Sequence, residues 1–232
     1  MNDKVKKVFK WIWDSFIWLG VLLLIIDIVT KNIIVNYQDA IKNAGGRNGG
    51  VDLIPGFLGI NYLINKNIAF GVSITGSDLA NRLLFIFVAL TITAVIIVIM
   101  VKKWDKINKY YRACLFMIIS GAIGNCIDRI FYSASYLNYT DSATGQLITG
   151  VVDWIDFYGI WGFNFNIADC AVVIAAFMLI IYMIVLDIID YVKKSKLEAK
   201  EESENTTKAI SKTEQEKNKY LDNKDENDSN NG

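Results

Sequence analysis

The sequence predicts an α-helical polytopic membrane protein with four transmembrane helices and a small extracytoplasmic β element. Three observations support this fold class. Of the 232 residues 53% are hydrophobic, only one is proline, and the chain contains four long apolar runs. Each run has about the 20 residues that a helix needs to cross some 30 Å of hydrocarbon. A soluble domain of this size would not need four such segments.

The four predicted spans differ in charge. They are Phe16–Val35, Leu83–Val101, Tyr110–Phe131 and Ile167–Val192. The second span carries no charge, whereas the others contain Asp27, Lys31, Asp128, Arg129 and Asp169. Ionisable side chains in a membrane usually pair, face a wet cavity or take part in chemistry. The first, third and fourth spans are therefore the ones expected to build a site.

Lysine and arginine predict the orientation, because short basic loops stay on the cytoplasmic side. Basic residues precede the first span, join the second to the third, and follow the fourth: Lys4, Lys6, Lys7 and Lys10; Lys102, Lys103, Lys106, Lys109 and Arg112; Lys193, Lys194 and Lys196. The outer loops are then Asn36–Arg82 and Tyr132–Asn166, although the first does contain Lys42, Arg47 and Lys66. Both termini are expected in the cytoplasm.

The two ends of the chain receive different predictions. The first span is too long for a cleaved signal and lacks a small-residue cleavage pattern, so it is expected to remain as a signal anchor. The tail, Lys193–Gly232, is rich in Lys, Glu, Asn, Asp and Ser with almost nothing apolar to bury. Such a composition predicts a disordered cytoplasmic tail after a membrane domain of residues 1–192.

The first outer loop predicts a small sheet. Its glycines at 45, 46, 49 and 50 and the pair Pro55-Gly56 mark turns, and Leu58–Leu63 and Ile68–Ile74 have the alternation of strands. Asn65–Gly71 either places amide and backbone groups beside a site or is only a turn that feeds a strand.

Two carboxylates bracket the start of the last span. Asp153 lies in Val151–Trp154 and Asp169 follows Asn166 by three residues. The chain has no histidine, which excludes histidine-dependent nucleophiles and histidine-bound metals, whereas two acids sharing one proton remain able to catalyse hydrolysis. The predicted topology puts these acids, with Asp27, Lys31, Asp128 and Arg129, at one outer-face site. Asp156 is interpreted as a loop carboxylate.

Structural alternatives remain open for several of these residues. Asn166 or Asp169 can simply cap the last helix. Asp128 and Arg129 are more readily explained as an ion pair that holds structure. The three cysteines, Cys114, Cys126 and Cys170, lack metal or redox spacing and are interpreted as packing residues. Intramembrane charges also suit a small ion- or proton-coupled transporter, although its usual repeats are not visible.

Five motifs, in order, give the chain a resemblance to lipoprotein signal peptidase, the signal peptidase II family of aspartyl membrane proteases. They are Asp27–Lys31, Asn65–Gly71, Gly121–Arg129, Val151–Asp153 and Phe165–Asp169. The resemblance implies removal of the signal peptide from a prolipoprotein, on the N-terminal side of a cysteine that carries a diacylglyceryl group. It implies a bacterial cell-membrane location and an active site at the outer face.

The resemblance also implies roles for individual residues. Asp153 and Asp169 match the catalytic pair, in which one carboxylate activates water and the other, protonated, polarises the scissile carbonyl and then protonates the leaving amine. No metal or other cofactor is implied, and no nucleic acid. Positions expected to shape the site are Asp27, Lys31, Asn65, Gly124, Asn125, Asp128, Arg129 and Asn166. Expected partners are lipidated prolipoproteins, membrane lipids and, as an inhibitor, a cyclic peptide antibiotic of the globomycin type.

The chain departs from the family pattern at three places. Asn67 replaces a usual glycine, Trp154 stands where phenylalanine is common, and the connection through Ser133–Thr149 is longer than in the compact family form. These differences bear on how substrate enters the site more than on the chemistry.

Overall fold

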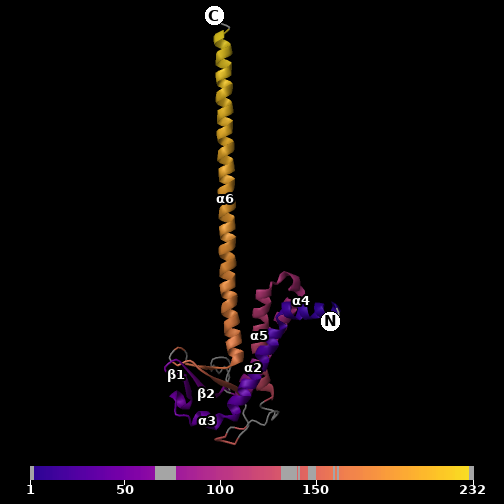
Figure 1. The fold of residues 1–232 in the computed structure, drawn as a ribbon, viewed down its shortest axis with the longest axis vertical. Coiled ribbons are helices and arrows are strands. Elements are labelled where there is room, and N and C mark those ends of the chain that lie inside the picture. The colour runs from indigo at the N-terminus through magenta and orange to yellow at the C-terminus, as the bar shows by residue number, and fades with distance from the viewer. Residues whose placement is uncertain are drawn as a thin grey trace. The chain divides into compact units, whose positions relative to one another are not determined.

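The structure is a computed structural model that describes residues 3–65, 77–131, 140, 142–145, 150–158, 160 and 162–229. It divides into two units, Met1–Leu179 and Ile180–Gly232. The first holds the sheet and most of the helices and the second continues the last helix (Figure 1). Within the described residues, four helices are long and apolar enough to cross a membrane: Ile17–Asn36, Leu79–Lys106, Lys109–Phe131 and Ile167–Glu202. The prediction of four membrane spans is confirmed.

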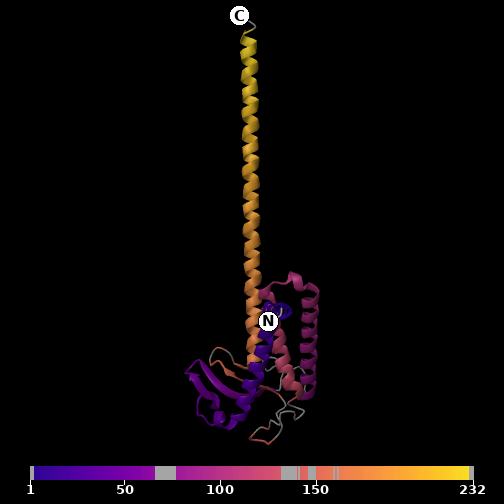
Figure 2. The same cartoon turned by 45° about the vertical axis from the view of Figure 1, so that its right-hand side comes forward.

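The membrane helices of the first unit pack around α5. In α5 (Lys109–Phe131) half of the apolar span is buried, against 22% in α2 (Ile17–Asn36) and 17% in α4 (Asp78–Lys103). Figure 2 shows α4 and α5 side by side, joined at one end through η3 (Trp104–Lys106). The side chains of α4 that face away from α5 are apolar and exposed, as expected for contact with lipid. Thus α5 is the centre of the bundle.

Small residues allow α5 to approach α6 (Ile167–Ser229) closely. A Cβ on Gly121 would collide with the backbone carbonyl oxygen of Ala168. Beyond this point Cys114 and Met117 of α5 pack against Ala171 and Ala175 of α6. The predicted packing role of Cys114 fits this arrangement, in which small residues let two membrane helices approach closely.

The sheet has four antiparallel strands in the order β1-β2-β3-β4. The first outer loop supplies β1 (Val51–Ile54) and β2 (Leu58–Asn65), and the second supplies β3 (Val151–Asp156) and β4 (Asn164–Phe165). The strand predicted at Leu58–Leu63 is confirmed, whereas the one predicted at Ile68–Ile74 lies outside the described residues. Sequence reasoning did not identify β3 or β4, so it missed that Asp153 lies on a strand.

The sheet lies at the end of the bundle where α2 finishes (Figure 1). Ile34 and Val35 of α2 and Ile41 of the short helix α3 (Gln38–Lys42) pack against Tyr62 of β2 and Val152 of β3. A single 3-10 turn, η1 (Arg47–Gly49), precedes β1. The second outer loop is tied to α3 because Gln38 Nε2 donates to the Thr140 carbonyl at 3.0 Å. The sheet is thereby fixed to α2, which also carries Asp27 and Lys31.

The structure and the sequence prediction differ at the C-terminus. Composition predicts a disordered tail from Lys193, but α6 continues as a helix to Ser229. The segment is rich in Lys and Glu, which have high helix propensity, and Lys194 and Glu198, one helical turn apart, form an ion pair at 3.9 Å. Helix propensity therefore explains why this segment is helical. The domain boundary at residue 192 stays a prediction.

Candidate active site

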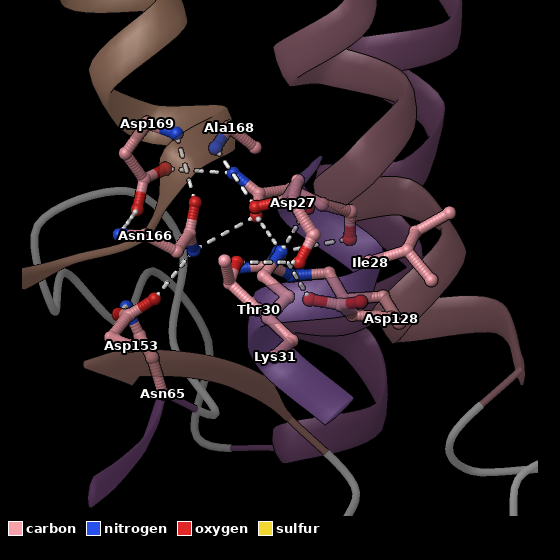
Figure 3. Close-up of polar contacts among 12 residues, drawn as sticks. Asp27, Ile28, Thr30, Lys31, Asn65, Asp128, Asp153, Asn166, Ala168 and Asp169 are labelled. Atoms are coloured by element: carbon pink, nitrogen blue, oxygen red, sulfur yellow. Dashed lines mark hydrogen bonds and ion pairs between the residues drawn. The ribbon is translucent and has the colours of Figure 1, made fainter. Parts of the chain in front are cut away.

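Asp153 lies in the middle of β3 with its side chain buried at the edge of the bundle. Its Oδ2 accepts a hydrogen bond from Asn65 Nδ2 at 3.0 Å, and its Oδ1 accepts one from Asn166 Nδ2 at 2.7 Å. Asn65 is on β2, where it pairs with Val151, so it is the diagonal neighbour of Asp153 on the same face of the sheet. Two neutral amides therefore hold this carboxyl group (Figure 3).

Asp169 is held by the start of α6. Its Oδ2 accepts from the Asn166 backbone N–H at 3.3 Å, while the Asp169 N–H donates to Asn166 Oδ1 at 2.9 Å. This reciprocal pair is a capping box, which satisfies two N–H groups that a helix start otherwise leaves without partners. The capping alternative is thus correct for both residues. It does not exhaust their contacts, because Asn166 also reaches Asp153 and Asp169 also reaches α5.

Asn125 of α5 joins the two acids to the rest of the site. Its Nδ2 donates to Asp169 Oδ1 at 2.7 Å, and its Oδ1 accepts from Asn166 Nδ2 at 3.1 Å and from Lys31 Nζ at 3.2 Å. The lysine ammonium can only donate, so Asn125 must present its oxygen there and its NH₂ group to Asp169. The orientation of one amide therefore links the charged residues of α2 to the carboxyl group of Asp169.

A second group of charges lies next to this network. Lys31 Nζ is 2.6 Å from Asp27 Oδ2 and 2.7 Å from Asp128 Oδ2, with side chains of Lys31 and Asp128 fully buried. Asp27 and Lys31 are one helical turn apart on α2, and Asp128 comes from α5. The ammonium offsets the cost of burying two carboxylates. We refer to Asp27, Lys31 and Asp128 as the buried charge cluster.

The buried charge cluster also reaches α6. Asp27 Oδ1 accepts from the Ala168 backbone N–H at 2.9 Å, at a helix start where a negative charge is favourable. Gly124 of α5 makes room for this contact, because a Cβ there would lie 2.8 Å from Asp27 Oδ2. α2, α5 and α6 therefore converge on one carboxylate, as Figure 3 shows for Asp27 and Ala168.

Arg129 lies at the α4 side of α5. Its Nη1 donates to the Asn125 carbonyl at 3.3 Å, and its guanidinium lies 3.7 Å from the centroid of the Phe85 ring. A guanidinium above an aromatic face is attracted by the ring's quadrupole. Arg129 thus connects α5 with α4, which is consistent with a structural role.

The environment of Asp153 favours its protonated form. Burial, and next the charge of Asp169, raise the pKa of Asp153 to about 7, whereas its hydrogen bonds from Asn65 and Asn166 act in the opposite direction. Two acids that affect each other in this way exchange protons as a pair. Near neutral pH such an arrangement can supply a proton from Asp153 while the partner acts as a base.

Asp156, interpreted from the sequence as a loop carboxylate, lies on the same strand as Asp153 but outside the site. It is three residues from Asp153, and side chains of a strand alternate between faces, so the two carboxyl groups are on opposite faces of β3. Asp156 is buried and stands across from Gly59 of β2. The interpretation of Asp156 as a residue outside the site agrees with this placement, although it belongs to a strand and not to a loop.

The structure brings together the site residues that the sequence predicted. They meet where α2, α5, β3 and the start of α6 converge. The group consists of the two acids, the amide residues, the buried charge cluster, Gly124 and Arg129. Sequence reasoning missed the Ala168 backbone N–H and the Phe85 ring, which no side-chain pattern identifies. Residues 66–71 of the second motif, including Asn67, and most of Ser133–Thr149 lie outside the described residues.

Comparison with known protein families identifies the following similarities. The family model for signal peptidase (SPase) II matches residues 19–185. The lipoprotein signal peptidase of Fusobacterium nucleatum is 34% identical over 166 residues, which cover 72% of this chain and 84% of the relative. The lipoprotein signal peptidase of Photorhabdus laumondii is 32% identical over 168 residues, covering 72% and 85%.

Solved structures give the same fold. A bacterial membrane enzyme is 26% identical, with a TM-score of 0.53 over 73% of this chain and 87% of its own. A second bacterial membrane enzyme is 25% identical, with a TM-score of 0.50 over 73% and 92%.

Proposed function

The chain belongs to the signal peptidase II family, and from this premise we propose that it uses Asp153 and Asp169 as a catalytic pair. Membership makes the protein a membrane protease of the lipoprotein signal peptidase type. The observation that supports the pair most directly is Asn166, whose side chain holds Asp153 and whose backbone holds Asp169. One residue thereby positions both carboxyl groups.

The substrate follows from the family and from the position of the site. We expect cleavage of diacylglyceryl-modified prolipoproteins on the N-terminal side of the lipidated cysteine. The site lies at one end of α2, α5 and α6, beside the sheet, where a signal helix can remain in the bilayer and its neighbouring acyl chains in lipid. Such a substrate need not leave the membrane to reach the acids.

Hydrolysis needs one ionised and one protonated carboxyl group. Asp169 as the carboxylate takes a proton from water, whose oxygen attacks the scissile carbonyl carbon, while protonated Asp153 polarises the carbonyl by donating a hydrogen bond to its oxygen. As the tetrahedral intermediate collapses, the C–N bond breaks and Asp153 gives its proton to the leaving amine, while Asp169 keeps the proton it took from water. The raised pKa of Asp153 supports one protonated carboxyl group in the pair, and we assign that role to Asp153. No covalent intermediate is needed.

The remaining polar residues position this pair. Asn125 and Asn166 fix the orientation of the carboxyl groups, and Asn65 holds Asp153 from the sheet. The buried charge cluster holds α2, α5 and α6 together through Asp27 and Lys31. We assign Asp128 and Arg129 to architecture, as the sequence suggested.

The proposed location is the bacterial cytoplasmic membrane, with both termini in the cytoplasm and the site at the outer face. The distribution of lysine and arginine supports this orientation. A transporter, the alternative from sequence, requires a polar path across the bilayer. The polar network instead gathers beside the sheet at one end of the bundle, which favours a hydrolase over a transporter.

The decisive experiment is an in vitro cleavage assay. Purified full-length protein in detergent is incubated with a diacylglyceryl-modified precursor and, as a control, the same precursor without lipid. We expect release of the signal peptide only from the lipidated form, and inhibition by a globomycin-type cyclic peptide. Folded protein that leaves the lipidated precursor intact would contradict the proposal and return attention to transport.

A further inference from the structure

The first helix, α1 (Asp3–Ser15), has two chemically distinct faces and lies at the opposite end of α2 from the sheet. At 100° per residue Val5, Val8, Phe9 and Ile12 fall on one face, and a lysine-rich face opposes them. Val5, Val8 and Phe9 are 41, 56 and 64% exposed. The exposed apolar face of α1 is not covered by the described residues, so contact with an apolar surface outside them would be favourable.

α1 is a separate helix and not an extension of the membrane span. Phe16 between α1 and α2 has the left-handed backbone angles φ 62° and ψ 14°, which break the helix. Ser15 fixes the break, since its hydroxyl donates to the Ile12 carbonyl at 2.7 Å and accepts from the Ile17 N–H at 3.2 Å. Figure 1 shows α1 turning aside from α2 at this point.

Four tryptophans mark the level of the membrane surface at this end. Trp13 stacks on Trp18 with ring centroids 5.0 Å apart, and Trp11 lies 6.0 Å from Trp104. Tryptophan is enriched where the hydrocarbon meets the headgroups, because its ring is apolar and its N–H is polar. Since Trp11 and Trp13 belong to α1, this helix has the composition expected at the depth of the bilayer interface.

The charges at this level are mainly positive. α1 carries Lys4, Lys6, Lys7 and Lys10, and α4 ends in Lys102 and Lys103, followed by Lys106 in η3. Lys109 at the start of α5 pairs with Asp14 of α1 at 2.6 Å, which holds the helix near this basic end. Basic residues beside a membrane surface attract anionic lipids.

We propose that α1 is an interfacial helix that binds anionic glycerophospholipid headgroups. Val5, Val8 and Phe9 enter the bilayer surface, and the lysines of the opposite face contact phosphate groups. A helix lies in the plane of the membrane interface when it is strongly amphipathic, with aromatic residues on its apolar side and lysines on its polar side. This lipid-binding surface is independent of the acids at the other end of the bundle.

The proposal is tested by measuring the depth of single spin labels on the full-length protein in nanodiscs. Labels are placed by Phe9→Cys on the apolar face and by Lys6→Cys on the basic face. Cys114 and Cys126 are buried, so only Cys170 is first replaced, by alanine. Relaxation by oxygen, which partitions into lipid, is compared with relaxation by a water-soluble nickel chelate, in phosphatidylcholine alone and with phosphatidylglycerol added.

With phosphatidylglycerol the label at 9 is expected to relax with oxygen several-fold more than with nickel, and the label at 6 to show the reverse. Replacing Lys4, Lys7 and Lys10 with glutamine should bring the label at 9 toward water, whereas the same change at Lys193, Lys194 and Lys196 should not. A label at 9 that stays in water in both lipids would overturn the proposal. So would protection from both reagents, which indicates a protein partner, or insertion that ignores phosphatidylglycerol and the lysines.

Discussion

The structure buries two neighbouring groups of carboxylates in different ways, and Asn125 connects the two groups. In the buried charge cluster, Asp27 and Asp128 lie 2.6 and 2.7 Å from the Lys31 ammonium. Asp153 and Asp169 instead accept hydrogen bonds from asparagine amides and one backbone N–H. A cation in contact with a carboxylate stabilises its ionised form. Neutral hydrogen-bond donors compensate burial less, so burial and the charge of a second acid favour the protonated form. The cluster is therefore suited to structure and the pair to proton transfer.

The largest expected effect of a single change is on the catalytic pair. Asp153→Asn or Asp169→Asn keeps the size of the side chain but removes its ability to exchange a proton. We expect each variant to cleave a lipidated precursor about a thousandfold more slowly or worse, since general acid and base functions contribute about 10²–10⁴-fold each. Cleavage rates in detergent, with thermal unfolding as a measure of folding, give the answer.

Asp156→Asn is the matched control for this experiment. It makes the same substitution on the same strand, on the opposite face of β3. We expect it to retain most of its activity. Near-normal cleavage by Asp153→Asn, together with a loss in Asp156→Asn, would mean that the acids are misassigned.

The next largest effect concerns stability. Lys31→Met removes the cation from the buried charge cluster and leaves Asp27 and Asp128 without it. Breaking a buried ion pair by removal of one partner costs about 3–5 kcal/mol. Lys109→Met breaks the more exposed pair with Asp14, and its cost should be much smaller because solvent screens that pair. Thermal unfolding of both variants compares them, and equal losses would contradict the distinction between buried and surface pairs.

Sequence predicted the membrane helices well because the bilayer sets both their length and their composition. The four predicted spans agree with the helices to within a few residues at most ends, since apolar runs and flanking lysines are visible without tertiary information. β3 was missed for the opposite reason. Val151–Asp156 is short, and it becomes a strand by pairing with β2, far away in the chain.

The members of the site could be predicted, but not their connections. Motif order identified Asn125 and Asn166, whereas the contacts of Asn125 with Lys31, Asn166 and Asp169 depend on how three helices meet. The Ala168 contact to Asp27 comes from the backbone and has no residue signature. The catalytic roles stay predictions until the variants are measured.

A smaller effect is expected where α5 passes Asp27. In Gly124→Ala the added Cβ would lie 2.8 Å from Asp27 Oδ2, so the carboxylate or the helix must shift. Such overpacking typically costs about 1–3 kcal/mol and should also reduce cleavage, because Asp27 holds the start of α6. Gly162→Ala is the control, as its Cβ meets nothing within 4 Å. If both variants unfold at the same temperature, the close contact is not required.

The smallest expected change is a shift in the pH dependence of cleavage. It tests the claim that asparagine amides leave Asp153 able to hold a proton. Asp153, with a pKa of about 7 in the folded protein against an ordinary value of 3.8, must be protonated to act as the acid. Cleavage should therefore decline as pH rises through about 7. The same difference means that its proton stabilises the fold fully below pH 3.8, and that this contribution is lost as pH rises through 7.

Asn65→Leu sharpens this test. The Asn65 hydrogen bond favours the ionised form of Asp153, so its removal should raise the pKa of Asp153 further and move the alkaline decline of kcat/KM to higher pH. Asn61→Leu changes the same residue type on the same strand and should leave the decline where it is. A shift to lower pH in Asn65→Leu would show that water replaces the amide and solvates the carboxylate. That result would assign Asn65 the role of excluding water rather than tuning the acid through its hydrogen bond.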